Sequence, residues 1–230
     1  MIVYDAAIEA QVDHTIAMFL EEEYAAKGDK LYIWYRNGFL AVNNARLTSS
    51  IGLAPKDKAI ARFVLEQCGF ASRFVEIGAG VGQASMLLAR LGLPTVAVET
   101  SHVNFDMMMR ARDYVSQRLD PSLPERMKPI NDFFPVHADE YVDSGTVLAF
   151  PSLSFGIDAE TERKILDALT LAGGVILSLT WFFRGRDQAE QVSLIAQIRD
   201  KGFDAPVEVY SWADFELGFS PDRIVFMKRL

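Results

Sequence analysis

Hydrophobic positions along the last two thirds of the chain fall into short runs that alternate with amphipathic stretches. Runs of apolar and β-branched residues predict strands at 72–78, 94–99, 126–131, 146–151, 173–182, 205–212 and 222–230. Apolar residues at helical spacing predict helices at 82–92, 101–119, 135–143, 158–169 and 187–202. Strands that alternate with helices form parallel sheets buried on both faces. The pattern therefore predicts an α/β fold with a doubly wound, seven-stranded, mostly parallel sheet.

The last two predicted strands are exceptions to the parallel arrangement. Only residues 213–221 separate them, which is too short for a crossover helix. We expect these two strands to pair as an antiparallel hairpin that closes the sheet at its edge.

The N-terminal quarter has a different pattern. Residues 4–28 carry apolar side chains at helical spacing, and 30–43 predict two strands around an Asn37-Gly38 turn. We interpret residues 1–55 as a cap of one helix and one hairpin that covers the substrate, and residues 56–230 as the main domain.

Composition and charge narrow the function. Half of the residues are hydrophobic, 23% are charged, and the net charge is −8. No basic stripe is present, so we do not expect nucleic acid as a partner. Cys68 is the only cysteine, as is typical of a reducing compartment. The longest apolar run, 171–183, is too short to span a membrane, and the first residues do not form a signal peptide. We expect a cytoplasmic protein without a membrane or metal partner.

The most informative motif is a glycine loop that follows the first strand of the main domain. Gly78, Gly80 and Gly82 alternate with other residues, and Glu76 precedes them. Dinucleotide-binding loops have Gly-x-Gly-x-x-Gly, but Gln83 stands at the third glycine position. A carboxylate beside the loop would repel a pyrophosphate. It favours a cationic ligand that carries an amino group and a sulfonium.

The stretch 75–82, VEIGAGVG, resembles the first motif of the class I S-adenosylmethionine-dependent methyltransferases. The resemblance implies S-adenosylmethionine as cofactor and S-adenosylhomocysteine as product. In this family an acid after the second strand binds the ribose, an acid and an apolar neighbour after the third strand bind the adenine, and the end of the fourth strand lies under the methyl group. The implied cofactor-binding residues are Glu76, Gly78, Ala79, Gly80, Gly82, Glu99, Thr100, Asp132, Phe133 and Pro151.

The acceptor is less defined. We expect a small molecule that is methylated on oxygen or nitrogen, with Tyr35, Trp181 and Arg184 in its pocket, although such side chains are also common in cores and on surfaces. His14 is a candidate base, against the alternative of a structural histidine. A protein methyltransferase, a non-catalytic cofactor sensor or scaffold and a nicotinamide enzyme are the alternative functions. The oligomeric state stays open.

Overall fold

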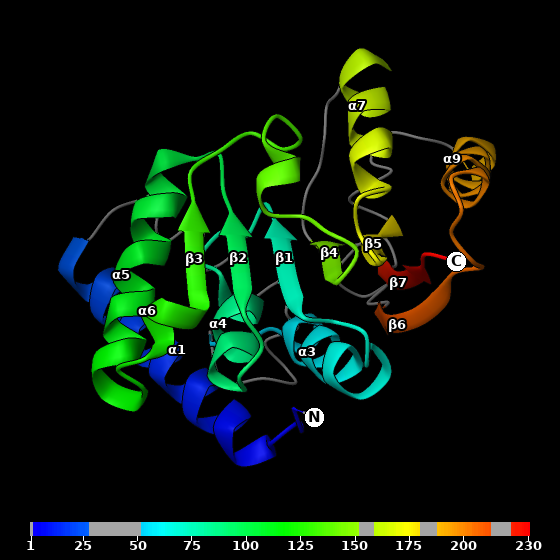
Figure 1. Cartoon of the computed structure of the whole chain (residues 1–230). Helices are drawn as coiled ribbons and strands as arrows, with labels where there is room; N and C mark the ends of the chain where they lie inside the picture. Colours follow the sequence, from blue (N-terminus) through cyan, green and yellow to red (C-terminus); the bar gives the residue numbers. More distant parts are fainter. Residues whose placement is uncertain (1, 28–51, 152–158, 180–187, 213–221) are drawn as a thin grey trace.

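The computed structural model of the chain describes residues 2–27, 52–151, 159–179, 188–212 and 222–230 (Figure 1). Within these residues the strands form one sheet of seven, in the order β3-β2-β1-β4-β5-β7-β6. The strands are β1 (Arg73–Ile77), β2 (Thr95–Val98), β3 (Met127–Ile130), β4 (Thr146–Phe150), β5 (Gly174–Ser178), β6 (Val207–Trp212) and β7 (Asp222–Lys228).

The strand directions confirm the predicted topology. Strands β1 to β5 pair in parallel, whereas β7 runs antiparallel to both β5 and β6. The closing hairpin thus inserts its second strand next to β5 and leaves β6 at the edge. Because the parallel strands all point the same way, their carboxyl ends meet at the upper edge of the sheet in Figure 1.

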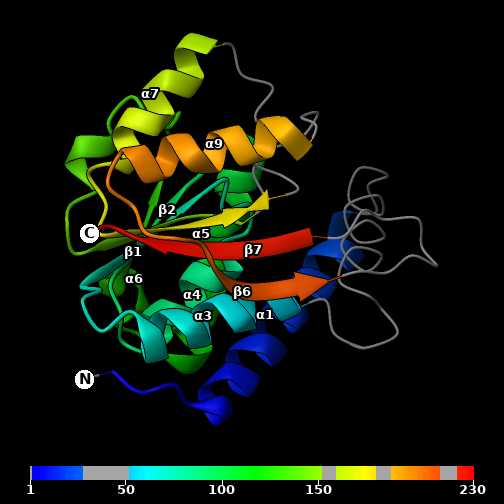
Figure 2. The same ribbon diagram turned by 90° about the vertical axis from the view of Figure 1, so that its right-hand side faces the viewer.

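Helices cover both faces of the sheet, as Figure 2 shows. The α-helices and the short 3-10 helix are α1 (Ala6–Lys27), α3 (Pro55–Gln67), α4 (Gln83–Arg90), α5 (His102–Leu119), α6 (Leu123–Arg126), η1 (Ala138–Glu140), α7 (Ala159–Leu169) and α9 (Gln188–Asp200). Two hydrophobic clusters result: one lies beneath α1, α3, α4 and α5, and the other lies beneath η1, α7 and α9. Every residue of β2, β4 and β5 is buried, as expected of central parallel strands.

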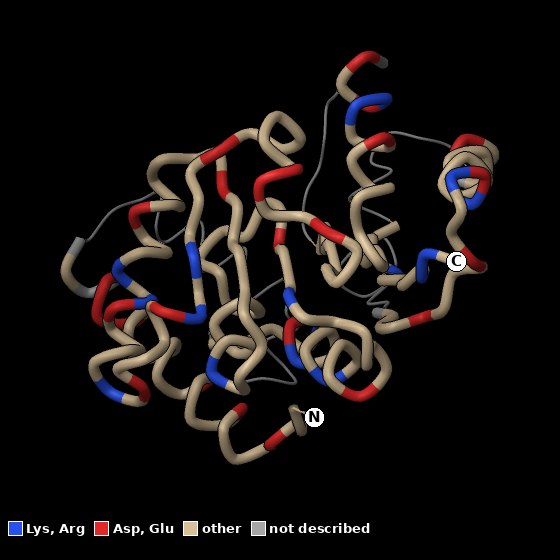
Figure 3. Tube along the Cα trace, in the orientation of Figure 1, with Lys and Arg blue, Asp and Glu red and all other residues tan. Residues whose placement is uncertain are grey.

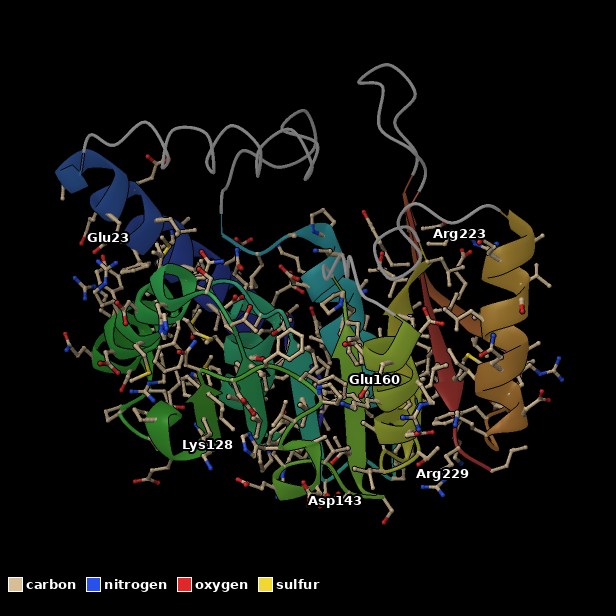
Figure 4. All side chains as sticks on the ribbon, turned by 90° about the horizontal axis from the view of Figure 1, so that it is seen from above. Glu23, Lys128, Asp143, Glu160, Arg223 and Arg229 are labelled. Carbon is tan, nitrogen blue, oxygen red and sulfur yellow. The ribbon has the colours of Figure 1, made fainter. Side chains whose placement is uncertain are left out.

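Helix α1 confirms the predicted N-terminal helix. It lies outside the layer of helices that packs directly on the sheet. Val12, Ile16 and Phe19 are buried, and the Phe19 ring packs against Tyr114 of α5 in a tilted arrangement. Glu23 forms an ion pair with Arg110 of α5; Figure 4 labels Glu23 at the end of α1. The predicted hairpin at 30–43 lies outside the described residues.

Two elements differ from the sequence predictions. Helix α3 was not predicted, although Ile60, Ala61 and Val64 form a buried face at helical spacing. Conversely, residues 135–143 were predicted as a helix but form turns and the short η1. Most backbone hydrogen bonds there join residues three apart, as in a 3-10 helix, and only the bond from the Val142 N–H to the Ala138 carbonyl joins residues four apart.

Candidate functional site

The glycine loop between β1 and α4 has a backbone that side chains would disfavour. Gly78, Gly80 and Gly82 have φ values of 70°, 58° and 78°, in the left-handed region that glycine adopts without strain. A Cβ atom on Gly82 would lie 2.8 Å from the Met127 side chain. The alternate spacing of the glycines is therefore a requirement of this turn, with Ala79 buried between them.

Backbone donors attach the glycine loop to the end of β2. The N–H groups of Gly78 and Ala79 donate to the Val98 carbonyl at 2.9 and 3.1 Å. The Gly80 N–H donates to Glu99 Oε2 at 2.8 Å. The loop is thus held at the carboxyl edge, directly beside the acid that follows β2.

Glu99 is a buried carboxylate, and each of its two oxygens accepts a hydrogen bond from a backbone N–H group. Its side chain is 7% exposed, and Oε1 accepts from the Ser101 N–H at 2.8 Å. Ser101 caps α5, as its position in the sequence indicates, by accepting from the Asn104 N–H. Each carboxylate oxygen keeps a further lone pair, so Glu99 is able to accept two hydroxyl donors in addition. Thr100 beside it is exposed.

The end of β3 is tied to the end of β2 by a residue that the sequence analysis did not single out. Asn131 Nδ2 donates to the Glu99 carbonyl at 2.7 Å and to the Thr100 carbonyl at 3.3 Å. The sequence signal that could have pointed to Asn131 is its amide side chain directly before the predicted adenine-binding acid. Asn131 therefore fixes the distance between two predicted binding segments.

Asp132 follows Asn131, and its carboxylate forms hydrogen bonds with residues of its own loop. Oδ1 accepts from the Phe133 N–H at 2.7 Å, and Oδ2 lies 2.9 Å from His137 Nδ1. The hydrogen bond to Asp132 raises the pKa of the His137 imidazole above its ordinary value. His137 itself is exposed in front of η1.

Phe133 and Phe134 are adjacent but have opposite surroundings. Phe134 is 2% exposed and packs against Phe150 with ring centroids 5.3 Å apart. Phe133 is 48% exposed. An exposed aromatic ring beside Asp132 gives the edge of the sheet an apolar surface suited to a flat ring.

Glu76 lies at the other end of the loop, in β1. Its carboxylate is 4% exposed, and Oε2 accepts from the Ser85 hydroxyl at 2.7 Å and the Ser85 N–H at 3.2 Å. Burial, with the nearby charge of Asp57 as the second cause, raises the pKa of Glu76 from its ordinary 4.5 to about 7. Asp57, in the first turn of α3, was not predicted as a site residue.

The N-terminus of α3 reaches the end of β4. Lys56 Nζ donates to the carbonyl of Pro151, which is buried directly after β4, at 3.3 Å. The residues of the predicted acceptor pocket, Tyr35, Trp181 and Arg184, lie outside the described residues. His14 is exposed on α1. The described residues contain no group of three or more His, Cys, Asp or Glu that could hold a metal ion.

Comparison with solved structures identifies the fold. Magnesium protoporphyrin IX methyltransferase (ChlM) from Synechocystis PCC 6803, solved with bound SAM, aligns over 99% of this chain and 100% of its own, with 12% identity and a TM-score of 0.58. The methyltransferase domain of bacterial CtHen1 aligns over 75% of this chain and 98% of its own, with 13% identity and a TM-score of 0.55.

A third similar structure is Sp1610 of Streptococcus pneumoniae, a candidate tRNA (m1A22) methyltransferase. It aligns over 77% of this chain and 70% of its own, with 14% identity and a TM-score of 0.54. The chain has the class I methyltransferase fold. No family model matches the sequence, and no curated protein matches it either.

The class I methyltransferase fold agrees with the expectation from the VEIGAGVG motif. The order of the strands and the antiparallel direction of β7 are observed in the structure of this chain itself, independently of the comparisons. None of the described helices is long and apolar enough to cross a membrane.

Proposed function

We propose that the chain is an S-adenosylmethionine-dependent methyltransferase that acts on a small molecule. Residues 56–230 bind the cofactor and residues 1–55 cover the acceptor. The observation that carries the proposal is the left-handed glycine loop, with the buried Glu99 accepting from its Gly80 N–H and the buried Glu76 at its base.

The charges of the site favour this cofactor over a dinucleotide. Glu76, Asp57 and Glu99 are all buried near the loop, and Figure 3 shows further acidic positions around the upper ends of β1, β2 and β3. Carboxylates at this edge would repel a pyrophosphate and attract a ligand with an ammonium and a sulfonium.

The described side chains fit the separate parts of S-adenosylmethionine. Glu99 accepts hydrogen bonds from the two ribose hydroxyls through the lone pairs that Gly80 and Ser101 leave free. Phe133 packs on the adenine with its exposed face. Asp132 accepts from the adenine amino group, and Glu76 binds the ammonium of the amino-acid end.

The cofactor would supply an electrophilic methyl group on a positively charged sulfur. The chain's contribution is mainly to hold the acceptor in line with that group. Pro151, held by Lys56, forms the floor of the acceptor site at the end of β4. From the sequence alone, we expect Tyr35, Trp181 and Arg184 to contribute to the acceptor pocket.

The charge distribution also supports a small acceptor. A polyanion such as RNA needs a basic surface, whereas the net charge here is −8 and the edge around the loop is acidic. The similar structures act on different acceptors by name, so the fold alone does not choose among them.

Calorimetry with S-adenosylmethionine, S-adenosylhomocysteine and NADH tests the cofactor. We expect binding of the first two and none of NADH; binding of NADH alone would contradict the proposal. Incubation with methyl-labelled cofactor and a fractionated cell extract then tests the acceptor. Label in the small-molecule fraction supports the proposal, label in protein indicates a protein methyltransferase, and tight binding without S-adenosylhomocysteine formation indicates a sensor.

A further inference from the structure

One peptide group joins the N-terminal helix α1 to the glycine loop. It is the peptide between Gly52 and Leu53, two buried residues that precede α3. Its carbonyl accepts from Gln83 Nε2 at 3.3 Å, and its N–H donates to Asp13 Oδ1 at 2.8 Å. Gln83 begins α4 directly after Gly82 of the loop, and Asp13 belongs to α1. Because a peptide group is a rigid plane, the two bonds link α1 to the loop through a single stiff unit.

The surroundings of this peptide group are closely packed. Gln83 is 7% exposed, and α1 and α3 both contact α4 on the same face of the sheet (Figure 2). A Cβ atom on Gly52 would collide with the backbone carbonyl and the carboxylate of Asp13, so the approach of α1 requires glycine here. Breaking either hydrogen bond is unfavourable, because a buried polar group that loses its partner is not solvated by water.

Asp13 is oriented for its bond by its second oxygen. Lys58 Nζ of α3 donates to Asp13 Oδ2 at 2.5 Å and lies 3.6 Å from Glu9 Oε1. The Oδ1 atom of Asp13 is thereby directed to the Leu53 N–H. Helices α1 and α3 thus hold the peptide group from one side, and Gln83 connects its other side to the loop.

The position of Gln83 determines where the glycine loop lies. Gly82 is the N-cap of α4, and its N–H donates to the Ala79 carbonyl at 2.8 Å, so the loop continues directly into the helix. Within the loop, the Gly80 N–H donates to Glu99 Oε2. A displacement of Gln83 would therefore shift the loop and also disturb the donors of Glu99.

We propose that Gln83 is a positioning residue for the cofactor, which makes the placement of the glycine loop depend on α1 through the Gly52–Leu53 peptide group. The inference rests on the proposed function and adds a role for a residue outside the predicted site. Dinucleotide-binding loops have a glycine at the position of Gln83. In this chain the position serves a hydrogen bond to the chain's own backbone, and Gln83 acts on the loop without touching the ligand.

Calorimetry of the whole chain with S-adenosylhomocysteine tests the proposal. Gln83→Leu keeps a side chain of similar size but removes the donor to the Gly52 carbonyl. The dissociation constant should rise by about three- to tenfold, the range that corresponds to one hydrogen bond. Gln197→Leu on the exposed surface of α9 is the matched control and should bind as the native chain does. An unchanged dissociation constant in Gln83→Leu would overturn the proposal.

Two substitutions of Asp13 separate the link from general stability. Asp13→Ala and Asp13→Asn both remove the ion pair with Lys58, but only asparagine keeps an oxygen for the Leu53 N–H. Alanine should weaken S-adenosylhomocysteine binding by about three- to tenfold, and asparagine should bring it close to the native level. Urea unfolding verifies that each variant is folded under the assay conditions. Equal affinity of the two variants would mean that the bond to Leu53 does not act on the cofactor site.

The double variant Gln83→Leu with Asp13→Ala tests whether both residues act through the same peptide group. Once the Gly52 carbonyl has lost its donor, α1 no longer holds the loop through this peptide, so the loss of Asp13 should add little. The double variant should bind about as weakly as Gln83→Leu alone. Effects that multiply would show that the two residues act independently and would contradict the link.

A ligand without the amino-acid end distinguishes positioning from direct contact. 5′-Methylthioadenosine has the same nucleoside and a thioether, as S-adenosylhomocysteine does, but no amino-acid end. Since a displaced loop also disturbs the donors of Glu99, Gln83→Leu should weaken both ligands. A loss confined to S-adenosylhomocysteine would show that Gln83 contacts the amino-acid end itself, against a positioning role.

The failures of the two proposals are distinguishable. If the native chain binds neither ligand, the proposed function is wrong. If the native chain binds both ligands and Gln83→Leu binds them equally well, only the role of Gln83 is wrong.

Discussion

The ends of β1 and β2 each carry a buried glutamate beside the same glycine loop, yet the two differ in their donors. Glu99 after β2 is 7% exposed, and each of its oxygens accepts from a backbone N–H. Glu76 in β1 is 4% exposed; its bonds to Ser85 engage one oxygen only, and a second acid lies nearby. Burial is nearly equal, so the donors and neighbouring charges make the difference.

This contrast indicates two kinds of binding group. Both oxygens of the Glu99 carboxylate are held in place by backbone N–H groups and have lone pairs left to accept hydroxyl donors. Burial of a negative charge on the Glu76 carboxylate is unfavourable until a proton or a ligand ammonium compensates that charge. For the proposed cofactor, this predicts a preorganised ribose side and an amino-acid side whose unfavourable charge is relieved by binding.

The largest expected effect comes from the loop that both glutamates share. Gly80→Val places a branched side chain on a residue with φ 58° that faces Glu99, so cofactor affinity should fall by about 100-fold or more. Calorimetry with S-adenosylhomocysteine measures it. Gly202→Val is the control, since Gly202 has φ 93° and no atom within 4 Å of an added Cβ. Equal loss of affinity in both variants would mean that backbone strain alone explains the result.

Glu99→Ala tests the preorganised side. It removes the acceptor of the Gly80 and Ser101 N–H groups and of the ribose hydroxyls, so binding should weaken by about 1–3 kcal/mol at every pH. S-adenosylhomocysteine and 5′-methylthioadenosine should lose affinity equally, because both carry the ribose. Unchanged affinity would show that Glu99 is not a cofactor ligand.

Glu76→Gln tests the unfavourable charge in the protein without ligand. The pKa of Glu76 is about 7 in the folded chain and 4.5 ordinarily, so folding favours its protonated form and stability falls as the pH rises through 7. At pH 8 the variant should be more stable to urea by on the order of 1–2 kcal/mol, and at pH 5 the gain should shrink. A destabilised variant at pH 8 would contradict the account.

Phe133→Ala should have the smallest effect. The lost ring contact with adenine should weaken both ligands by about 0.5–1.5 kcal/mol. Stability should change by less than about 0.5 kcal/mol, because Phe133 is 48% exposed. Phe134→Ala, which removes a buried ring, is the contrasting variant and should mainly destabilise the fold. Unchanged affinity of Phe133→Ala would remove the ring from the binding site.

Local patterns were sufficient for most of the fold. Buried parallel strands appear as apolar runs, and the short 213–221 segment decided the direction of the last strand. The position of Glu99 beside the glycine loop was predictable because one helix and one strand separate the two. Helix α3 was missed although its buried residues Ile60, Ala61 and Val64 are spaced as on one face of a helix.

The amino-acid side of the site was only half predictable. Asp57 and Glu76 are 19 positions apart, and only the tertiary packing of α3 brings the charge of Asp57 close enough to act on Glu76. Asn131 likewise acts across two strands through backbone carbonyls. Such relations depend on tertiary structure, for which a single sequence has no local signal.

The most direct test is a crystal structure of the chain with S-adenosylhomocysteine bound. We expect both ribose hydroxyls within hydrogen-bonding distance of the Glu99 carboxylate, the adenine against Phe133, and the ammonium beside Glu76. An adenosine bound away from Glu99 and Asp132 would contradict the central claim that this loop and its acids form a methyl-donor site.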